Sequence, residues 1–367
     1  MYPFRNYLFK LDPERAHTLT LGALGLAGEI APARWILRLL CAAPSRPVKA
    51  FGLSFKNPIG LAAGYDKDAR AVRGLAALGF GYIEVGTVTP LPQPGNPGPR
   101  LFRLVEDEAL INRLGFPSKG SASVQRRLSP RMRGSWLTEM LGIPGRTGPR
   151  RTRDPHALRL KAGCILGVNI GRNASTPNEE AVLDYLSLLE SFAPQADYLA
   201  VNVSSPNTVG LRALQQETAL AALLDQLHAQ RSIEQEKIGR PLPLLVKLSP
   251  DLSNSELDAA LDAVVGTHMD GVIVTNTTLA RDGVRSETGS QQGGLSGAPL
   301  RRRSEAVLQR TVDRVAGKIA IVSTGGVLGS DDVQRRFAMG ADLVQLYTGL
   351  VYRGPGLVRQ ILRDLPS

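Results

Sequence analysis

The chain has 367 residues, of which 43% are hydrophobic, and a formal net charge of +11. This length allows one large domain with an appendage, and the hydrophobic content is sufficient for an extensive core. No apolar run reaches the roughly 18–20 residues needed to span a bilayer. Two cysteines, Cys41 and Cys164, are too few for a disulfide framework or a metal site. A reducing cytoplasm is therefore the simplest compartment.

Residues 1–45 predict a pair of helices outside the main domain. Asp12-Pro13 is a good helix start, with an acid at the N-cap and proline at the first helical position. Pro32 can begin a second helix that runs to Leu40. The apolar surface of this pair is large for so small a unit. Two interpretations stay open: a lid packed on the main domain, or a device that dips into a membrane surface.

Eight short runs rich in Val, Ile and Leu recur along the chain without strict polar alternation. Such runs are typical of strands buried on both faces of a parallel sheet. Most are separated by enough residues for a helix, so the pattern predicts an α/β fold, a (β/α)8 TIM barrel with a small N-terminal helical extension. The predicted strands are Ile59–Gly64, Tyr82–Thr87, Cys164–Ile170, Tyr198–Val203, Leu242–Leu248, Gly271–Thr275, Ile319–Ser323 and Leu343–Tyr347.

We accordingly divide the chain into a helical extension over residues 1–45 and a barrel over residues 46–367. A basic insertion at about 129–157, rich in Pro, Gly and Arg, interrupts the barrel between a predicted helix and the third predicted strand. Residues 126–161 hold ten basic residues and two acidic ones, so much of the net charge is local. Helix-to-strand connections lie at the face of a barrel away from the chemistry. We interpret the insertion as a surface segment.

Polar or glycine-rich clusters follow the eight predicted strands. A barrel gathers these strand ends at one face, where active sites lie. Residues far apart in the sequence would therefore meet around one pocket. The clusters, in chain order, are Asp66-Lys67, Thr87, Asn169, Asn202–Asn207, Lys247, Asn276-Thr277, Gly325-Gly326 and Tyr347-Thr348.

Four of these clusters carry chemistry suited to a flat, anionic ligand. The segment Val201–Thr208, VNVSSPNT, can hold a polar ligand or form an ordinary Ser-Pro-Asn turn. Lys67 and Lys247 could each be a solvated surface charge, but as a pair at strand ends they suit an anionic substrate and a cofactor that gains negative charge on reduction. Asn276-Thr277 can both donate to and accept from a ring that bears amides and carbonyls.

Glycine-rich loops follow the seventh and eighth predicted strands, at Ser323–Gly326 and Tyr347–Gly349. In barrels these loops often bind phosphate through backbone N–H groups, which indicates a phosphorylated ligand. No G-x-G-x-x-G follows a first strand and no paired His or Cys spacing occurs, so neither a Rossmann NAD site nor a metal site is expected. None of the four histidines lies in a strand-end cluster, which argues against histidine acid–base catalysis.

Taken together, these segments resemble the class 2 dihydroorotate dehydrogenases, which are membrane-associated and use quinone. The motifs that carry the likeness occur in family order, cover nearly all of Phe51–Pro355 and are preceded by LDPERAH. They are FGLSFKNPIGLAAGYDKD, EVGTVTP, PRLFRL, LINRLGF, GVNIGRN, VNVSSPNT, LRALQ, VKLSPDL, VTNTT, GGLSG, STGGV and VQLYTG.

The resemblance implies a bound FMN and the oxidation of (S)-dihydroorotate to orotate, with quinone as electron acceptor, in de novo pyrimidine (UMP) biosynthesis. It implies an FMN site made by Ala63, Gly64, Tyr65, Asp66, Lys67, Thr87, Asn169, Asn202, Lys247, Thr275, Gly297, Gly326, Tyr347 and Thr348. It implies a pyrimidine site made by Lys67, Asn112, Arg113, Leu114, Gly115, Phe116, Asn202, Asn207, Asn276 and Thr277.

By the same likeness, Ser205 is the base that removes the proton from substrate C5 while hydride passes from C6 to flavin N5. A hydroxyl is a poor base near neutrality, so its position must compensate. Thr208 and a water, sheltered by Phe116, would form a proton relay. The soluble relatives carry cysteine at this position and pass electrons elsewhere, so the serine and the N-terminal helices agree on the quinone class.

The resemblance also gives the helix pair a role, as an apolar tunnel that leads quinone from the bilayer to the flavin. His17, Arg103 and Tyr347 are the candidates for its polar end. It implies peripheral attachment at the cytoplasmic face of the cell membrane. The insertion departs from the family, in which we expect a much shorter connection. Its arginines and Trp136 would strengthen attachment to anionic lipid, at ~1 kcal/mol per basic residue, unless it is a loop with no role.

Two other functions are alternatives to this one. A phosphate-binding barrel such as an aldolase or isomerase explains the last two loops but not VNVSSPNT together with the helix pair, and the colour of bound flavin distinguishes the two. The arginine-rich insertion is the one feature that suggests a nucleic-acid binder. It lacks interleaved aromatics and any recognised motif, so no nucleic acid is expected as a partner.

Overall fold

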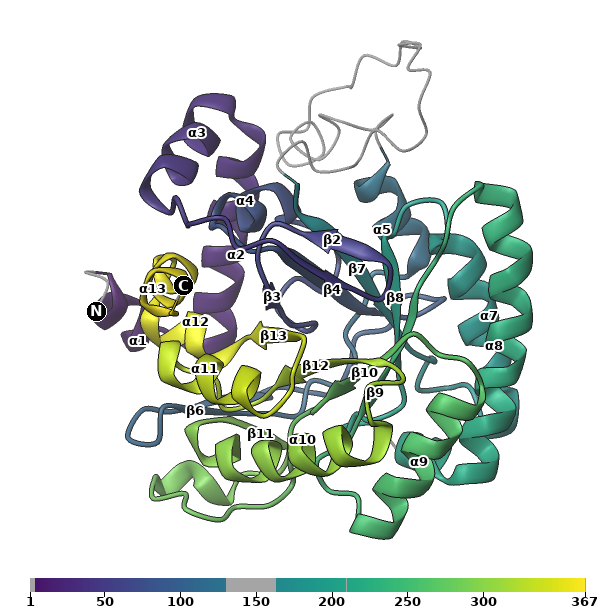
Figure 1. Cartoon of the computed structure of the whole chain (residues 1–367). Helices are drawn as coiled ribbons and strands as arrows, with labels where there is room; N and C mark the ends of the chain where they lie inside the picture. The colour runs from purple at the N-terminus through teal and green to yellow at the C-terminus, as the bar shows by residue number, and fades with distance from the viewer. Residues whose placement is uncertain (1–3, 130–162, 209, 367) are drawn as a thin grey trace.

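The centre of the computed structural model, which describes residues 4–129, 163–208 and 210–366, is a closed barrel of eight parallel strands (Figure 1). Neighbouring strands follow the order β10-β12-β13-β3-β4-β7-β8-β9. Each strand falls on one of the eight predicted apolar runs, so the predicted barrel is confirmed. The strands are β3 (Ile59–Leu61), β4 (Tyr82–Val88), β7 (Ile165–Ile170), β8 (Tyr198–Asn202), β9 (Leu244–Leu248), β10 (Gly271–Val274), β12 (Ala320–Thr324) and β13 (Leu343–Leu346).

Helices alternate with the strands and cover the outside of the barrel (Figure 1). Because side chains on the two faces of each strand meet either these helices or the barrel interior, nearly every strand residue is buried. The covering helices are α4 (Val72–Ala77), α5 (Ser121–Leu128), α7 (Ala181–Phe192), α8 (Glu217–Ile238), α9 (Asn254–Gly266), α10 (Arg301–Val315), α11 (Ser330–Ala338), α12 (Thr348–Arg353) and α13 (Leu357–Asp364).

A hairpin that the sequence pattern did not predict closes the N-terminal end of the barrel. It consists of antiparallel strands β1 (Val48–Ala50) and β2 (Leu53–Phe55). Phe55 packs against Tyr82, and both belong to a cluster that includes Tyr198 and other first residues of the barrel strands. This apolar cluster fills the N-terminal end of the barrel. A ligand would therefore reach the barrel interior from the opposite end, as in other barrels of this kind.

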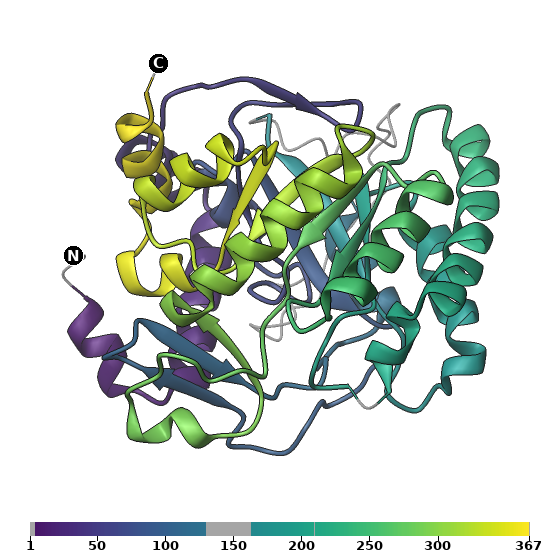
Figure 2. The same cartoon turned by 60° about the horizontal axis from the view of Figure 1, so that its bottom comes forward.

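A second unpredicted element lies at that opposite end (Figure 2). It is a three-stranded antiparallel sheet in the order β11-β6-β5, made of β5 (Leu101–Leu104), β6 (Ala109–Asn112) and β11 (Gly294–Gly297). Its strands come from the loops that follow β4 and β10. The sheet therefore extends the wall of the barrel on the side where the strands end.

The N-terminal extension folds into three helices, α1 (Arg5–Lys10), α2 (Pro13–Glu29) and α3 (Ala31–Leu40). The predicted helix pair is confirmed, whereas α1 was not predicted. The Asp12 carboxylate caps α2 by accepting from the backbone N–H groups of Glu14 (3.1 Å) and Arg15 (2.9 Å). None of the described helices is both long and apolar enough to cross a bilayer.

Helix α2 packs closely on the barrel helix α4. A Cβ built on Gly28 would lie 2.5 Å from the backbone nitrogen of Gly74, so the two helices touch backbone to backbone. Arg73 and Glu29 form an ion pair at 2.7 Å across the same contact. In contrast, α3 has no buried residue. The predicted insertion at 129–157 lies outside the described residues apart from Ser129, which ends α5.

Candidate active site

The carboxyl ends of the barrel strands surround a pocket that holds about 950 Å³ of empty space, including the open solvent at its mouth. Its wall is completed by residues of β6 and β11 in the small sheet. The convergence of strand-end clusters that the sequence predicted is therefore present. The pocket has the size and the mixed polar and apolar lining of a site for organic ligands.

Two lysines bring positive charge into the pocket. Lys247 projects from β9 and is 5% exposed, and Lys67 lies in the loop after β3. Burial and the nearby Arg100 lower the pKa of Lys67 to about 8, so its ammonium group is near its titration point in mildly alkaline solution. Burial also lowers the pKa of Lys247, whereas the neighbouring Glu84 raises it. Both groups suit an anionic ligand.

A chain of side-chain amides forms one wall of the pocket. The Asn202 amide donates to Thr87 Oγ1 (2.9 Å) and Asn169 Oδ1 (3.2 Å), and the Thr87 hydroxyl donates to Asn169 Oδ1 (2.6 Å). The Asn169 amide in turn donates to Glu84 Oε1 at 2.9 Å. Because the side-chain amides of Asn169 and Asn202 are both buried and hydrogen-bonded, the groups that face the pocket are held in fixed orientations.

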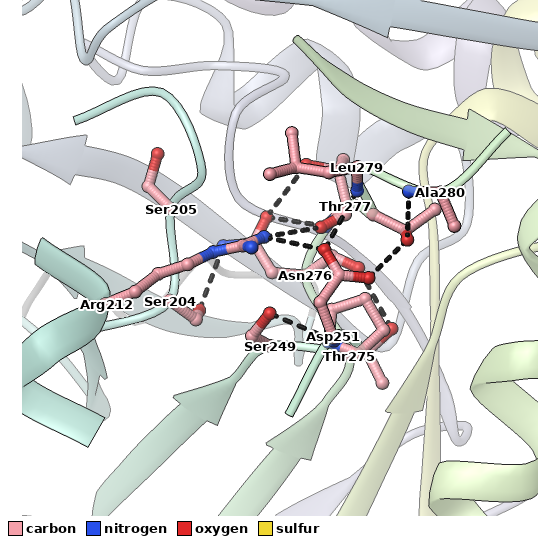
Figure 3. A network of polar contacts seen from close by, with 12 residues as sticks. Ser204, Ser205, Arg212, Ser249, Asp251, Thr275, Asn276, Thr277, Leu279 and Ala280 are labelled. Carbon is pink, nitrogen blue, oxygen red and sulfur yellow. Dashed lines mark hydrogen bonds and ion pairs between the residues drawn. The ribbon is translucent and has the colours of Figure 1, made fainter. Parts of the chain in front are cut away.

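The loop after β8 holds the two serines of VNVSSPNT, and their side chains point to opposite sides (Figure 3). The Ser204 hydroxyl donates to Asn202 Oδ1 (3.0 Å) and accepts from the Asn276 amide (2.9 Å), so Ser204 is part of the wall. Ser205 lines the pocket, and its oxygen accepts from the backbone N–H of Asn207 (3.3 Å). The Asn207 amide donates to Asn112 Oδ1 at 3.1 Å, which joins this loop to the small sheet.

A partly buried carboxylate connects the same loop to its neighbours (Figure 3). Asp251, after β9, forms an ion pair with Arg212 at 3.0 Å and accepts from the backbone N–H of Leu279 at 2.8 Å. It also accepts from the Thr278 hydroxyl. Loops from β8, β9 and β10 are thus fixed to one another, which holds Ser205 and Asn276 in register.

Glycines form the rim near the ends of β12 and β13. Gly297 and Gly326 have φ angles of +95° and +74°, a region that favours glycine. A Cβ on Gly326 would lie 2.5 Å from the Arg301 Cα at the start of α10. The Ser296 and Thr348 hydroxyls lie 2.8 Å apart on the same rim. This is the cradle of backbone and hydroxyl groups expected for a phosphate.

Most of the predicted cofactor, substrate and catalytic residues line this pocket. They are Ala63, Gly64, Lys67, Thr87, Asn112, Leu114, Gly115, Phe116, Asn202, Ser205, Asn207, Lys247, Thr275, Asn276, Thr277, Gly297, Gly326, Tyr347 and Thr348. Lining residues outside the predicted set are Ala62, Ser296, Leu300, Thr324, Gly325, Val327 and Gln345. All of these except Leu300 stand inside motifs quoted above, such as STGGV, which contains Thr324, Gly325 and Val327.

Five predicted residues lie outside the pocket lining and contact protein instead. The Asp66 carboxylate accepts from the backbone N–H groups of Arg70 and Ala71, each at 2.7 Å, and so fixes the start of α4. The Arg113 guanidinium donates to Pro99 O (3.1 Å) and lies over the ring of Phe102. The other three are Tyr65, Asn169 and Thr208.

The three predicted quinone residues are arranged in two groups. The rings of His17, Tyr65 and Tyr347 follow one another edge to face, with centroid separations of 5.1 Å and 5.6 Å, and lead from α2 to the pocket. Burial and the nearby Lys67 lower the pKa of His17 to about 4, so this imidazole is neutral at pH 7. Arg103 instead donates to Phe9 O at 3.0 Å and lies over the Phe9 ring in α1.

In the part of the chain that the structure describes, no three His, Cys, Asp or Glu side chains gather as metal ligands would.

Comparison with known proteins agrees with this geometry. The family model for dihydroorotate dehydrogenase matches residues 46–367. The chain belongs to the dihydroorotate dehydrogenase family. It is 46% identical to the dihydroorotate dehydrogenase (quinone) of Acidithiobacillus ferrooxidans, over 99% of this chain and 93% of that protein. It is 44% identical to the protein of the same name from Halorhodospira halophila, over 98% of this chain and 96% of that protein.

Solved structures of the family share the fold. A crystal structure of DHODH from Eimeria tenella in complex with ferulenol has a TM-score of 0.76 and 36% identity, and the match covers 91% of this chain and 90% of that one. A ligand-free structure from the same organism has a TM-score of 0.74 at the same identity, over 92% of this chain and 93% of that one.

Proposed function

We propose that this chain oxidises (S)-dihydroorotate to orotate, with FMN as its bound cofactor and a membrane quinone as the final electron acceptor. Family membership supports the reaction. The observation that carries the proposal is the convergence, in one pocket, of a serine at a strand end, two lysines, paired asparagines and a glycine-rich rim. An aldolase or isomerase barrel would account for the glycine-rich rim but not for the serine loop together with the N-terminal helices.

The residues present fit FMN by their chemistry. The rim of Gly297, Gly326 and Thr348 suits the phosphate, and the amide of Asn202 with the hydroxyl of Thr275 suits the polar edge of the ring. Gln345 lines the pocket, and its Oε1 atom is buried without a partner among the described residues, so it can accept from a ring N–H. When bound, FMN would accept hydride from the substrate and later release electrons to quinone.

The substrate would be held by the side of the pocket opposite the rim. The Lys67 ammonium provides a counter-charge for the substrate carboxylate, and the linked amides of Asn112 and Asn207 can pair with the amide and carbonyl groups of the ring. Asn276 and Thr277 offer the same chemistry from the loop after β10. Binding by several fixed polar groups would orient C5 and C6 of the substrate for reaction.

Ser205 would remove the C5 proton. It is 5% exposed, and Phe116 and Leu114 line the pocket beside it, so bulk water has little access. The Thr208 hydroxyl is buried and has no hydrogen-bond partner among the described residues. It is therefore available to a water that would carry the proton away. Such positioning would compensate for the low basicity of a serine hydroxyl.

The N-terminal helices would attach the protein to an anionic membrane surface at the cytoplasmic face of the cell membrane. Large apolar side chains of α3 are exposed, including Trp35 (64%), Leu39 (61%) and Leu40 (62%). Arg34 and Arg38 lie on the same helix and suit anionic headgroups. Quinone would reach the flavin past His17, Tyr65 and Tyr347, whose rings line up towards the pocket.

A steady-state assay tests the proposal. Purified protein, supplied with dihydroorotate and a short-tailed quinone, should form orotate, and removal of either reactant should stop the reaction. Ser205→Ala serves as the matched control, because it removes one hydroxyl from the pocket. Orotate formation at the wild-type rate by this variant would exclude Ser205 as the base, and no orotate from the wild type would exclude the reaction.

A further inference from the structure

Glu84 is a carboxylate in the interior of the barrel, on β4, with no exposed surface. It lies beneath the pocket and does not line it. Its Oε1 atom accepts from the Asn169 amide (2.9 Å), and its Oε2 atom accepts from the Tyr198 hydroxyl (3.0 Å) and the Gln345 amide (2.8 Å). The Lys247 ammonium lies 3.8 Å from Oε1. Five barrel strands thus meet at one carboxylate.

A buried carboxylate is costly unless hydrogen bonds and an opposite charge compensate for its lost hydration. Here three neutral donors satisfy its oxygens, and Lys247 is its ion-pair partner. Lys247 reaches the pocket, whereas Glu84 does not. The ion pair therefore crosses the pocket floor, with the cation above and the anion below. An anion is unnecessary for packing in this position, since a neutral amide could accept two of the same bonds.

We propose that Glu84 is a positioning residue that holds Lys247 charged and in place at the pocket floor, and that it thereby sets how strongly the bound flavin holds electrons. The inference rests on the proposed function, because it assumes a flavin above Lys247. Reduction adds negative charge to a flavin, so an ammonium group below the ring favours the reduced form. The carboxylate beneath moderates this effect, because the pair together carries no net charge.

The titratable groups that face Glu84 are two phenols and the Lys247 ammonium group, and of these we expect only the ammonium group to change its protonation. Tyr82 on β4 and Tyr198 on β8 are buried, and burial together with the Glu84 charge raises the pKa of both phenols, so they stay protonated. Asn169 and Gln345, from β7 and β13, do not titrate. The protonation of Lys247 therefore depends on the charge of Glu84, because burial lowers the pKa of Lys247 and Glu84 raises it.

The test compares wild type and Glu84→Gln, each as flavin-loaded protein, by equilibration with a redox dye of known potential between pH 6 and 9.5. We expect the variant to hold reduced flavin about tenfold more strongly at pH 6, where Lys247 keeps its charge without a compensating anion. The two proteins should converge at high pH, because Glu84 raises the pKa of Lys247 and its loss lets the ammonium group lose its proton at a lower pH than in the wild type. Curves that coincide at every pH would overturn the proposal.

Tyr198→Phe is the matched control. It removes one hydrogen bond to the same carboxylate and leaves the charge, so its curve should follow that of the wild type. If Tyr198→Phe changed the curve as Glu84→Gln does, packing and not charge would be the cause, and the proposal would be overturned. Dihydroorotate must bleach the wild-type flavin in the same preparation, which separates a failure of this inference from a failure of the proposed function.

If the Glu84→Gln protein does not retain flavin, the unfolding temperature provides a second test. The double variant Glu84→Gln/Lys247→Met removes both charges, so it should unfold at a higher temperature than Glu84→Gln alone, in which a buried ammonium has lost its partner. Additive losses of the two single variants would contradict a coupled pair. This outcome too would overturn the proposal.

Discussion

The pKa of Lys67 leads to a prediction about ligand affinity. Because burial and Arg100 lower this pKa to about 8, Lys67 is charged below pH 8 and loses its charge as the pH rises through 8. The charged fraction falls from about nine-tenths at pH 7 to about one-tenth at pH 9. If the charged form binds the carboxylate, affinity for orotate should fall about tenfold over this range, or about 1.4 kcal/mol. Lys67→Arg should abolish the fall, since a guanidinium stays charged.

The assay is titration of orotate into flavin-loaded protein at pH 7, 8 and 9, with the shift in flavin absorbance as readout. The comparison between variants cancels any ionisation of orotate itself. Lys49→Arg makes the same substitution at an exposed lysine of the hairpin and should keep the wild-type pH dependence. An equal fall in wild type and Lys67→Arg, or no fall in the wild type, would refute the role of Lys67.

Three further predictions concern the base, the helix contact and the membrane surface. Ser205→Ala should retain flavin but slow its reduction by dihydroorotate about 10²–10⁴-fold, as measured by stopped flow, and a near-normal rate would contradict this. Gly28→Ala should lower the free energy of unfolding by about 1–3 kcal/mol, because its Cβ would overlap the α4 backbone. Gly22→Ala, with no atom within 4 Å of its Cβ, should not be destabilised in the same denaturant titration; equal losses would refute the contact. Leu39→Glu should weaken sedimentation with anionic vesicles about tenfold, whereas Leu183→Glu, at an equally exposed leucine of α7, should not, and equal effects would exclude α3 as the attachment site.

The sequence predicted the barrel because each of its strands is a contiguous apolar run that local pattern can recognise. The strands of the hairpin and the small sheet have only three or four residues each. β3 and β10 of the barrel are no longer than this, but all of their residues are apolar. In contrast, a polar side chain interrupts β1, β2 and β5, at Lys49, Ser54 and Arg103. β11 is in addition defined by pairing with a distant segment, as in the register of Gly294 with Asn112. The site residues were predictable once the strands were, because parallel strands deliver their carboxyl ends to one face.

Glu84 shows what the sequence could not reveal. It stands in the quoted motif EVGTVTP, but its hydrogen-bond partners Asn169, Tyr198 and Gln345 lie 85, 114 and 261 positions away. Only the closed barrel brings them to one point. Asp66 is placed in the cofactor site by the family resemblance, and the structure adds that its carboxylate accepts from the backbone N–H groups of Arg70 and Ala71 at the start of α4.

Anaerobic mixing of the purified, flavin-loaded protein with dihydroorotate, followed by addition of quinone, tests the central claim most directly. The account predicts that the visible absorbance of the flavin bleaches as orotate forms in equal amount, and that quinone restores it. A protein that is colourless and cannot be loaded with flavin, or a flavin that dihydroorotate leaves oxidised, would contradict the account.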